Sequence, residues 1–103
     1  MDGITSIDKV VAMYEVTFSH AIVPNMQAKV KVLSRSIGDF MARINVARID
    51  RQLGFSAGEC GLGDTEQEAL DDLLTRFVQD ARMHMPPNGY LSSDFEWISA
   101  DEF

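Results

Sequence analysis

A glycine-rich segment that contains the single cysteine of the chain is the first candidate for chemistry. Residues 58–63 read Gly-Glu-Cys-Gly-Leu-Gly, and a helix is predicted to begin at residue 66. Glycines ahead of a helix N-terminus can cradle a phosphate. The dinucleotide fingerprint needs another glycine three residues after Gly63, where Glu66 stands, and no Gly-Lys-Ser/Thr ending follows. The segment therefore predicts a tight turn between a strand and a helix.

Cys60 is the candidate nucleophile, and His20 or His84 would have to lie beside it to activate the thiol. No cation stands next to Cys60 in the sequence to favour the thiolate. The three residues also lack the spacing of a zinc site, and one thiol cannot form an internal disulfide. We therefore predict a protein that is not an enzyme, that holds no metal and no cofactor, and that occupies a reducing compartment.

The cations of the chain are concentrated in one segment. The net charge is -7, which argues against non-specific binding of nucleic acid, because such binding needs clustered Lys and Arg. Residues 29–51 are the exception, with six cations against two acids. If Lys29, Lys31 and Arg43 share a solvent-exposed face opposite the acidic helix, the segment predicts an alternative function as a small nucleic-acid-binding module. The six cations are Lys29, Lys31, Arg35, Arg43, Arg48 and Arg51.

The acids are concentrated in the second half, where residues 52–103 carry eleven acids against two cations. Either the basic segment balances this charge inside the molecule, or the acids form a surface for a partner. We expect an acidic helix face and tail to block a basic surface of a partner protein, with Trp97 or Phe95 as the desolvated anchor. The predicted partner-binding residues are Glu66, Asp71, Asp72, Asp80, Asp94, Phe95, Glu96, Trp97, Asp101 and Glu102.

A capped helix is predicted over residues 66–83. Thr65 and Glu68 form a capping box, in which hydroxyl and carboxylate accept hydrogen bonds from the exposed amides of the first turn. Apolar residues then recur at intervals of three and four, which is typical of a helix with one buried side. The sequence from Pro86 to Gly89 would end the helix. The apolar stripe consists of Ala69, Leu70, Leu73, Leu74, Phe77, Val78 and Ala81.

Strands are predicted before this helix, because the sequence between residues 27 and 46 has a period of two. Apolar residues alternate with polar ones in two runs, residues 28–32 and 40–46, and residues 34–39 supply a turn between them. The run at residues 53–57 predicts the next strand of a meander. These strands need a cover for their apolar face, and the predicted helix follows directly.

Two segments leave alternatives open. Residues 8–23 have apolar residues at both helical and strand spacing, and their β-branched and aromatic content favours a strand from about Ala12. Residues 90–103 are either a last strand or an acidic-aromatic segment that docks on a partner. The chain as a whole, residues 1–103, predicts a single domain. Its fold class is α+β, with a small antiparallel sheet of three to four strands packed against one main helix.

The order of strands, glycine step and capped helix resembles the partial double-stranded-RNA-binding-type fold of HicB-like antitoxins. The likeness covers residues 27–82 and is carried by the hairpin Lys31–Val46, the step Gly61–Thr65 and the helix opening Glu66–Leu70. The resemblance implies a non-catalytic module that blocks a partner protein. Members of that family often append a DNA-binding domain, whereas about twenty residues follow the predicted helix here.

These observations predict an inhibitor or antitoxin of phage type, anti-CRISPR type or immunity type. Its partner would be a toxin or a nucleic-acid-handling protein with a basic surface. A small sheet also leaves an edge through which a homodimer could form. No apolar run approaches the about 20 residues that span a bilayer, so we expect a cytoplasmic protein without a membrane contact.

Overall fold

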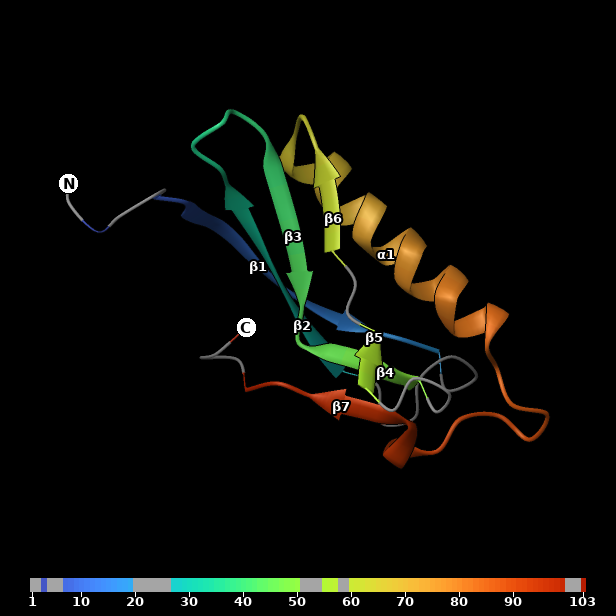
Figure 1. Cartoon of the computed structure of the whole chain (residues 1–103). Helices are drawn as coiled ribbons and strands as arrows, with labels where there is room; N and C mark the ends of the chain where they lie inside the picture. The colour runs from blue at the N-terminus through green and yellow to red at the C-terminus, as the bar shows by residue number, and fades with distance from the viewer. Residues whose placement is uncertain (1–2, 4–6, 20–26, 51–54, 58–59, 100–102) are drawn as a thin grey trace.

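A four-stranded antiparallel sheet in the order β1-β2-β3-β6 forms the centre of the computed structural model (Figure 1). The structure describes residues 3, 7–19, 27–50, 55–57, 60–99 and 103. The α+β fold class is confirmed, since one main helix packs on this sheet. The strands are β1 (Lys9–Thr17), β2 (Gln27–Ser34), β3 (Phe40–Ile44) and β6 (Cys60–Gly63).

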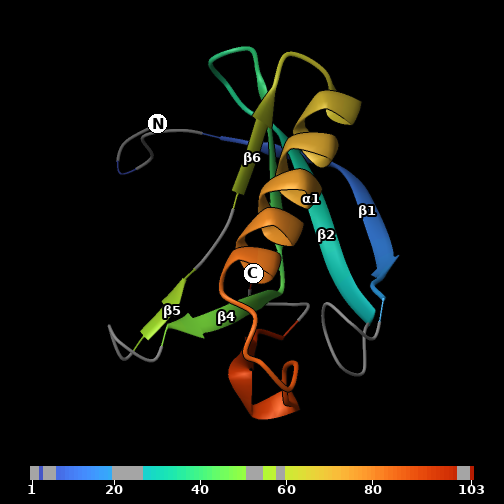
Figure 2. The same cartoon turned by 90° about the vertical axis from the view of Figure 1, so that its right-hand side faces the viewer.

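Helix α1 spans Glu66–Met83, as predicted, and lies along one face of the sheet (Figure 2). Thr65 Oγ1 accepts a hydrogen bond from the backbone N–H of Glu68 at 3.1 Å. The carboxylate of Glu68 in turn accepts from the N–H of Asp64 at 3.3 Å, one residue before the position that a standard capping box uses. The side chains that α1 buries are Ala69, Leu70, Leu73, Phe77 and Ala81.

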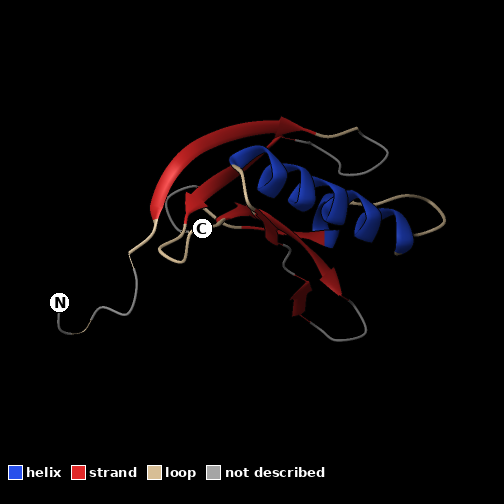
Figure 3. Ribbon diagram, turned by 90° about the horizontal axis from the view of Figure 1, so that it is seen from above, coloured by secondary structure: helices blue, strands red, loops and turns tan. Residues whose placement is uncertain are grey.

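The core lies between α1 and the sheet. Alternate residues of β2, Ala28, Val30 and Val32, have no exposed surface, and Ala42 of β3 is equally buried. Strand β1 is long and bent, and Figure 3 shows it curving along one side of the helix. Just beyond its end, the ring of Phe18 stacks on Phe77 with centroids 5.0 Å apart. The apolar residues of the alternating pattern in β2 are therefore the ones that face the helix.

A second, smaller sheet has the order β5-β4-β7 and is formed by β4 (Val46–Asp50), β5 (Phe55–Ala57) and β7 (Phe95–Trp97). A short 3-10 helix, Ser92–Asp94, leads into β7. The tail thus supplies a strand, although it pairs with β4 and not with the main sheet. The prediction of the next meander strand at residues 53–57 is confirmed for residues 55–57, because β5 pairs with β4, the strand directly before it; residues 53–54 lie outside the described part.

Asn45 separates β3 from β4, where the sequence predicted one continuous strand to residue 46. Its side-chain carbonyl oxygen accepts from the N–H of Lys29 at 2.8 Å, and its own N–H donates to the carbonyl of Lys29 at 3.0 Å. Its carbonyl also accepts from the N–H of Ile98 at 2.8 Å. The nearly buried Asn45 therefore joins both sheets, and the chain leaves one for the other at this residue.

The glycine segment forms an edge strand, where the sequence predicted only a turn. Strand β6 pairs with β3 and lies directly under α1. A Cβ atom at Gly61 would overlap the backbone of Ala69 and Leu73, and one at Gly63 would come within 2.5 Å of the Glu68 side chain. The glycines are therefore explained by the close approach of a helix and not by a ligand.

Strand β1 confirms an extended conformation for the part of residues 8–23 that the structure describes, and it begins at Lys9 instead of near Ala12. Its pairing with β2 shifts by one residue between Val10 and Ala12, which is a β-bulge. Residues 20–23, including His20, lie outside the described part.

Replacing Asn45 with Ala is expected to lower the free energy of unfolding by about 1–3 kcal/mol, because the partly buried hydrogen bond from the N–H of Lys29 loses its acceptor. Urea denaturation followed by circular dichroism measures this change. Asn88→Ala in the exposed turn after α1 is the matched control and should change stability by less than about 0.5 kcal/mol. Equal stability of the two variants would contradict the role of Asn45 as the junction.

Replacing Gly61 with Ala is expected to cost about 1–3 kcal/mol or more, since α1 must move away from β6 to admit the methyl group. The neighbouring Cys60→Ala, at an exposed position of the same strand, should stay within about 0.5 kcal/mol of the parent. Thermal denaturation of both variants tests this difference. A Gly61→Ala variant as stable as Cys60→Ala would show that the approach is looser than described.

Candidate interaction surfaces

The face of the main sheet that points away from α1 carries three rows of side chains, which the strand register defines. One row is apolar, one is cationic around its middle, and one is a pair of opposite charges. We call this the outer sheet face. In order of the rows, its residues are Val10, Leu33, Met41 and Leu62, then Met13, Lys31, Arg43 and Cys60, then Glu15 and Lys29.

The apolar part of the outer sheet face is largely open to solvent. Val10, Met13 and Leu62 are 49%, 52% and 47% exposed, and Leu33 between them is buried. Sequence analysis did not single out these residues. The signal was present in the alternation along residues 9–17, but Leu62 was hidden between glycines that predicted a turn. An exposed group of large apolar side chains on one face is typical of an interaction site.

The cations of the outer sheet face are Lys29, Lys31 and Arg43. Lys31 and Arg43 are register partners, and Lys29 lies opposite Glu15. Lys29 and Arg43 are exposed, and Lys31 is half-buried. The helix with its acids covers the opposite side of the sheet (Figure 2). Lys29 and Arg43 are therefore exposed on the side opposite the acidic helix, and Lys31 shares that side but is half-buried.

The remaining predicted cations are used inside the molecule. Arg35 pairs with Asp39 at the hairpin turn, with Nε to Oδ1 at 2.6 Å, and this hydrogen bond lowers the pKa of Asp39. Arg48 is buried and holds Asp80 of α1 through two hydrogen bonds of 2.7 and 3.2 Å. The burial of Arg48 corrects its prediction as a nucleic-acid contact, whereas the contact predicted for Arg35 stays a prediction. Arg51 lies outside the described residues.

Several residues of the predicted acidic surface also form contacts within the molecule. Asp80 serves the ion pair with Arg48, which ties the second sheet to α1. Asp94 is buried, and its carboxylate accepts from the N–H of Leu91 at 2.8 Å. Phe95 is buried too, with its ring edge-on to Tyr90 at 5.0 Å. Asp94 and Phe95 therefore belong to the core, which corrects their prediction as surface contacts.

Asp72 binds the edge of the sheet. Its carboxylate accepts from the backbone N–H of Leu62 at 3.0 Å and from Arg76 Nε at 3.0 Å. The Leu62 amide and then the Arg76 side chain hold the pKa of Asp72 below its ordinary value. The outward amide of β6 is thus occupied by a side chain of α1.

The other predicted acids lie apart from one another. Glu66 begins α1 and is half-buried. The pKa of Tyr14 is raised, first by desolvation of the Tyr14 hydroxyl and then by the negative charge of Glu66 and a hydrogen bond with it. Asp71 is exposed on α1 and accepts from the Gln67 side chain at 2.8 Å. Glu96 is exposed on β7, and Trp97 is 41% exposed. Asp101 and Glu102 lie outside the described residues. The predicted acids that the structure describes are therefore divided between α1 and β7.

The two candidate catalytic residues that the structure describes, Cys60 and His84, lie on different elements. Cys60 is exposed on β6, whereas His84 lies at the other end of α1 and contacts Asp80 with Nδ1 to Oδ1 at 3.3 Å. No three His, Cys, Asp or Glu side chains of the described part are placed to share a metal ion. A hollow of about 490 Å³ follows α1 and is lined by the turn residues 86–89 with Leu91 and Asp94. Asp94 is already hydrogen-bonded there.

Comparison with known proteins yields no match: no family model, no curated protein and no solved structure matches the chain. The resemblance to HicB-like antitoxins therefore stays a prediction. Within the described residues, no helix combines the length and the apolar character needed to cross a membrane.

Asp72→Asn is expected to destabilise the protein at neutral pH and to have a smaller effect in acid. Because the folded state lowers the pKa of Asp72, its carboxylate stabilises the fold above the ordinary value of 3.8. That contribution is lost as the pH falls through the lower folded pKa. Urea midpoints of parent and variant at about pH 7, 4 and 2.5 should therefore converge.

The matched control for this prediction is Asp71→Asn, whose carboxylate contacts a side chain of its own helix instead of a strand amide. A stability difference for Asp72→Asn that stayed constant across the acid range would contradict a charge-dependent contact at the edge of β6.

Proposed function

We propose that this protein is a non-enzymatic protein-binding module of the inhibitor or antitoxin class, and that it docks on its partner through the outer sheet face. The observation that carries the proposal is the apolar row of the outer sheet face, in which Val10 on β1 and Leu62 on β6 are exposed at its two ends, with the exposed Met13 beside Val10 on β1. Burial of apolar surface is the main source of affinity in protein association. The resemblance to HicB-like antitoxins supports the class.

This proposal moves the binding surface from the acidic helix to the sheet. Asp72 and Asp80 have partners within the molecule, and Glu66 and Glu68 stand in the first turn, where the helix dipole favours acids in any protein. These acids are therefore explained without a basic partner. The cations of the outer sheet face instead favour a partner with carboxylates around an apolar patch.

Nucleic-acid binding is the second candidate, because Lys29, Lys31 and Arg43 lie on the face opposite the acidic helix. Three cations release few counterions, and the exposed side chains beside them are apolar. The aromatic platforms on which single strands stack are lacking among the exposed apolar residues of this face. Protein binding therefore fits the face better.

Glutamate substitutions on and off the face test the proposal. Met13→Glu and Leu62→Glu place a charge in the apolar part, and Ile37→Glu and Met83→Glu are matched controls at exposed apolar residues of the hairpin turn and the helix end. Each variant and the parent are used to capture proteins from nuclease-treated cells of the source organism. A captured protein is then purified and titrated against all five proteins by calorimetry.

The expected result is a binary complex that the parent and both controls form equally, and that Met13→Glu and Leu62→Glu weaken at least about tenfold, or 1.4 kcal/mol. Equal binding by all five proteins would place the interface elsewhere. Recovery of RNA or DNA without nuclease, lost in Lys31→Glu, would favour the second candidate.

A further inference from the structure

We propose that the outer sheet face recognises an aromatic side chain flanked by carboxylates on a partner segment, in the place where the chain's own Phe103 lies. The inference rests on the proposed function and names the chemistry of the partner. It begins from Phe103, which is 8% exposed although the helix covers the other side of the sheet.

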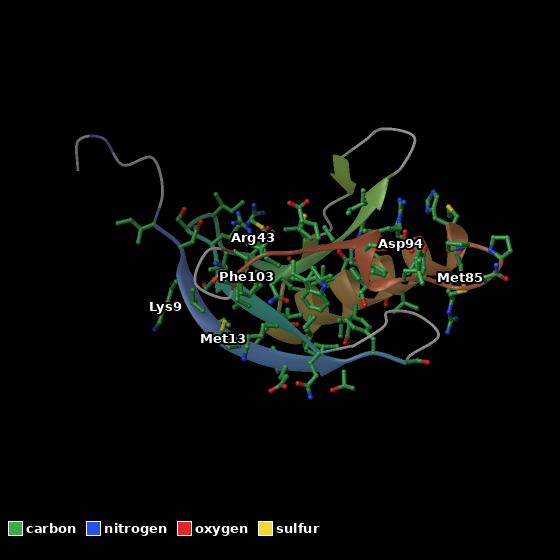
Figure 4. The ribbon with its side chains drawn as sticks, turned by 90° about the horizontal axis from the view of Figure 1, so that it is seen from below. Lys9, Met13, Arg43, Met85, Asp94 and Phe103 are labelled. Carbon is green, nitrogen blue, oxygen red and sulfur yellow. The ribbon has the colours of Figure 1, made fainter. Side chains whose placement is uncertain are left out.

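Phe103 lies against the cationic row. The Nζ atom of Lys31 is 4.8 Å from the centroid of the Phe103 ring, which is the geometry of a cation–π contact. Lys31 points away from α1, because its neighbours Val30 and Val32 are in the core. In Figure 4, Phe103 and Arg43 lie at the same end of the molecule as Met13, and Asp94 and Met85 lie at the other end. The outer sheet face thus already holds one aromatic ring.

The surroundings of this ring select for negative charge. The register partners of Lys31 are Met13 and Arg43, and Lys29 stands two residues along β2. Glu15 is the one acid among the residues that define the outer sheet face. A ring inserted beside Met13 and Lys31 gains contacts with a thioether and an ammonium group, and carboxylates on either side would meet Lys29 and Arg43.

A protein segment fits this arrangement better than RNA. We call the place of the Phe103 ring on the outer sheet face the seat. It holds a single ring next to Lys31, whereas a nucleic acid strand needs a continuous row of cations for its phosphates. The site also accommodates the chain's own Phe103, so a partner must compete with it. Such competition lowers the apparent affinity by the fraction of molecules in which the seat is open.

The probe is a labelled nine-residue peptide with the sequence of residues 95–103, which combines aromatic and acidic residues. Fluorescence anisotropy measures its binding to the full chain and to Phe103→Ala. We expect Phe103→Ala to bind the peptide at least about tenfold more tightly than the parent. In the Phe103→Ala background, Lys31→Gln and Arg43→Gln should each weaken binding several-fold, and Arg82→Gln on α1 is the matched cation control.

Two further measurements separate recognition from general charge or loss of folding. A peptide in which the three acids are replaced by amides, and one in which its last Phe is replaced by Ala, should both bind more weakly. Amide chemical shifts of the unaltered chain, recorded with excess peptide, should change along β1, β2 and β3 and not along α1. This second readout does not depend on the stability of the Phe103→Ala variant.

Several outcomes would overturn the inference: equal peptide affinity of parent and Phe103→Ala, shift changes on α1, or tighter binding of an RNA oligonucleotide than of the peptide. Failure of the proposed function gives a different pattern. If Met13→Glu and Leu62→Glu abolish the binary complex while the peptide never binds, the docking surface stands and the aromatic, acidic partner chemistry is wrong.

Discussion

The close approach of α1 to the glycine strand β6 is the contact on which the rest of the molecule depends. A side chain at Gly61 would push the helix outward, and the stripe of Leu70, Leu73 and Phe77 would then leave a gap over β2 and β3. With the glycine, a single helix fills one face of a four-stranded sheet. The other side of the sheet carries no helix, and Phe103 covers part of it beside Lys31.

Charge follows from the same geometry. The acids of α1 cap its first turn, hold the edge of β6 through Asp72 and anchor β4 through Asp80. Lys29, Lys31 and Arg43 stand on the outer sheet face. Several acids therefore have a role inside the molecule, and the net charge of -7 does not by itself identify a basic partner.

Local patterns were sufficient to predict the helix and the hairpin from the sequence, because the capping residues of α1 and the period of two in β2 act within a few residues. Asn45 and the pair Arg48 and Asp80 were not predictable, since their contacts join residues 16 and 32 positions apart. Strand β6 could not be predicted for a related reason. Its glycines are needed because α1, which follows in the sequence, packs closely on it. For the candidate site, the placement of Lys29, Lys31 and Arg43 could be predicted from alternation, but the apolar row needed the register of four strands.

Both edge strands of the main sheet, β1 and β6, have a feature that hinders pairing with a strand of another chain. The bulge at Val10 breaks the even spacing of hydrogen bonds along β1, and Asp72 already occupies an outward amide of β6. Addition of a strand from a neighbouring chain to either edge is therefore hindered, which disfavours edge-to-edge aggregation of the sheet. The outer sheet face is the surface that we propose for contact with other molecules, and binding there would leave every strand paired with its neighbour.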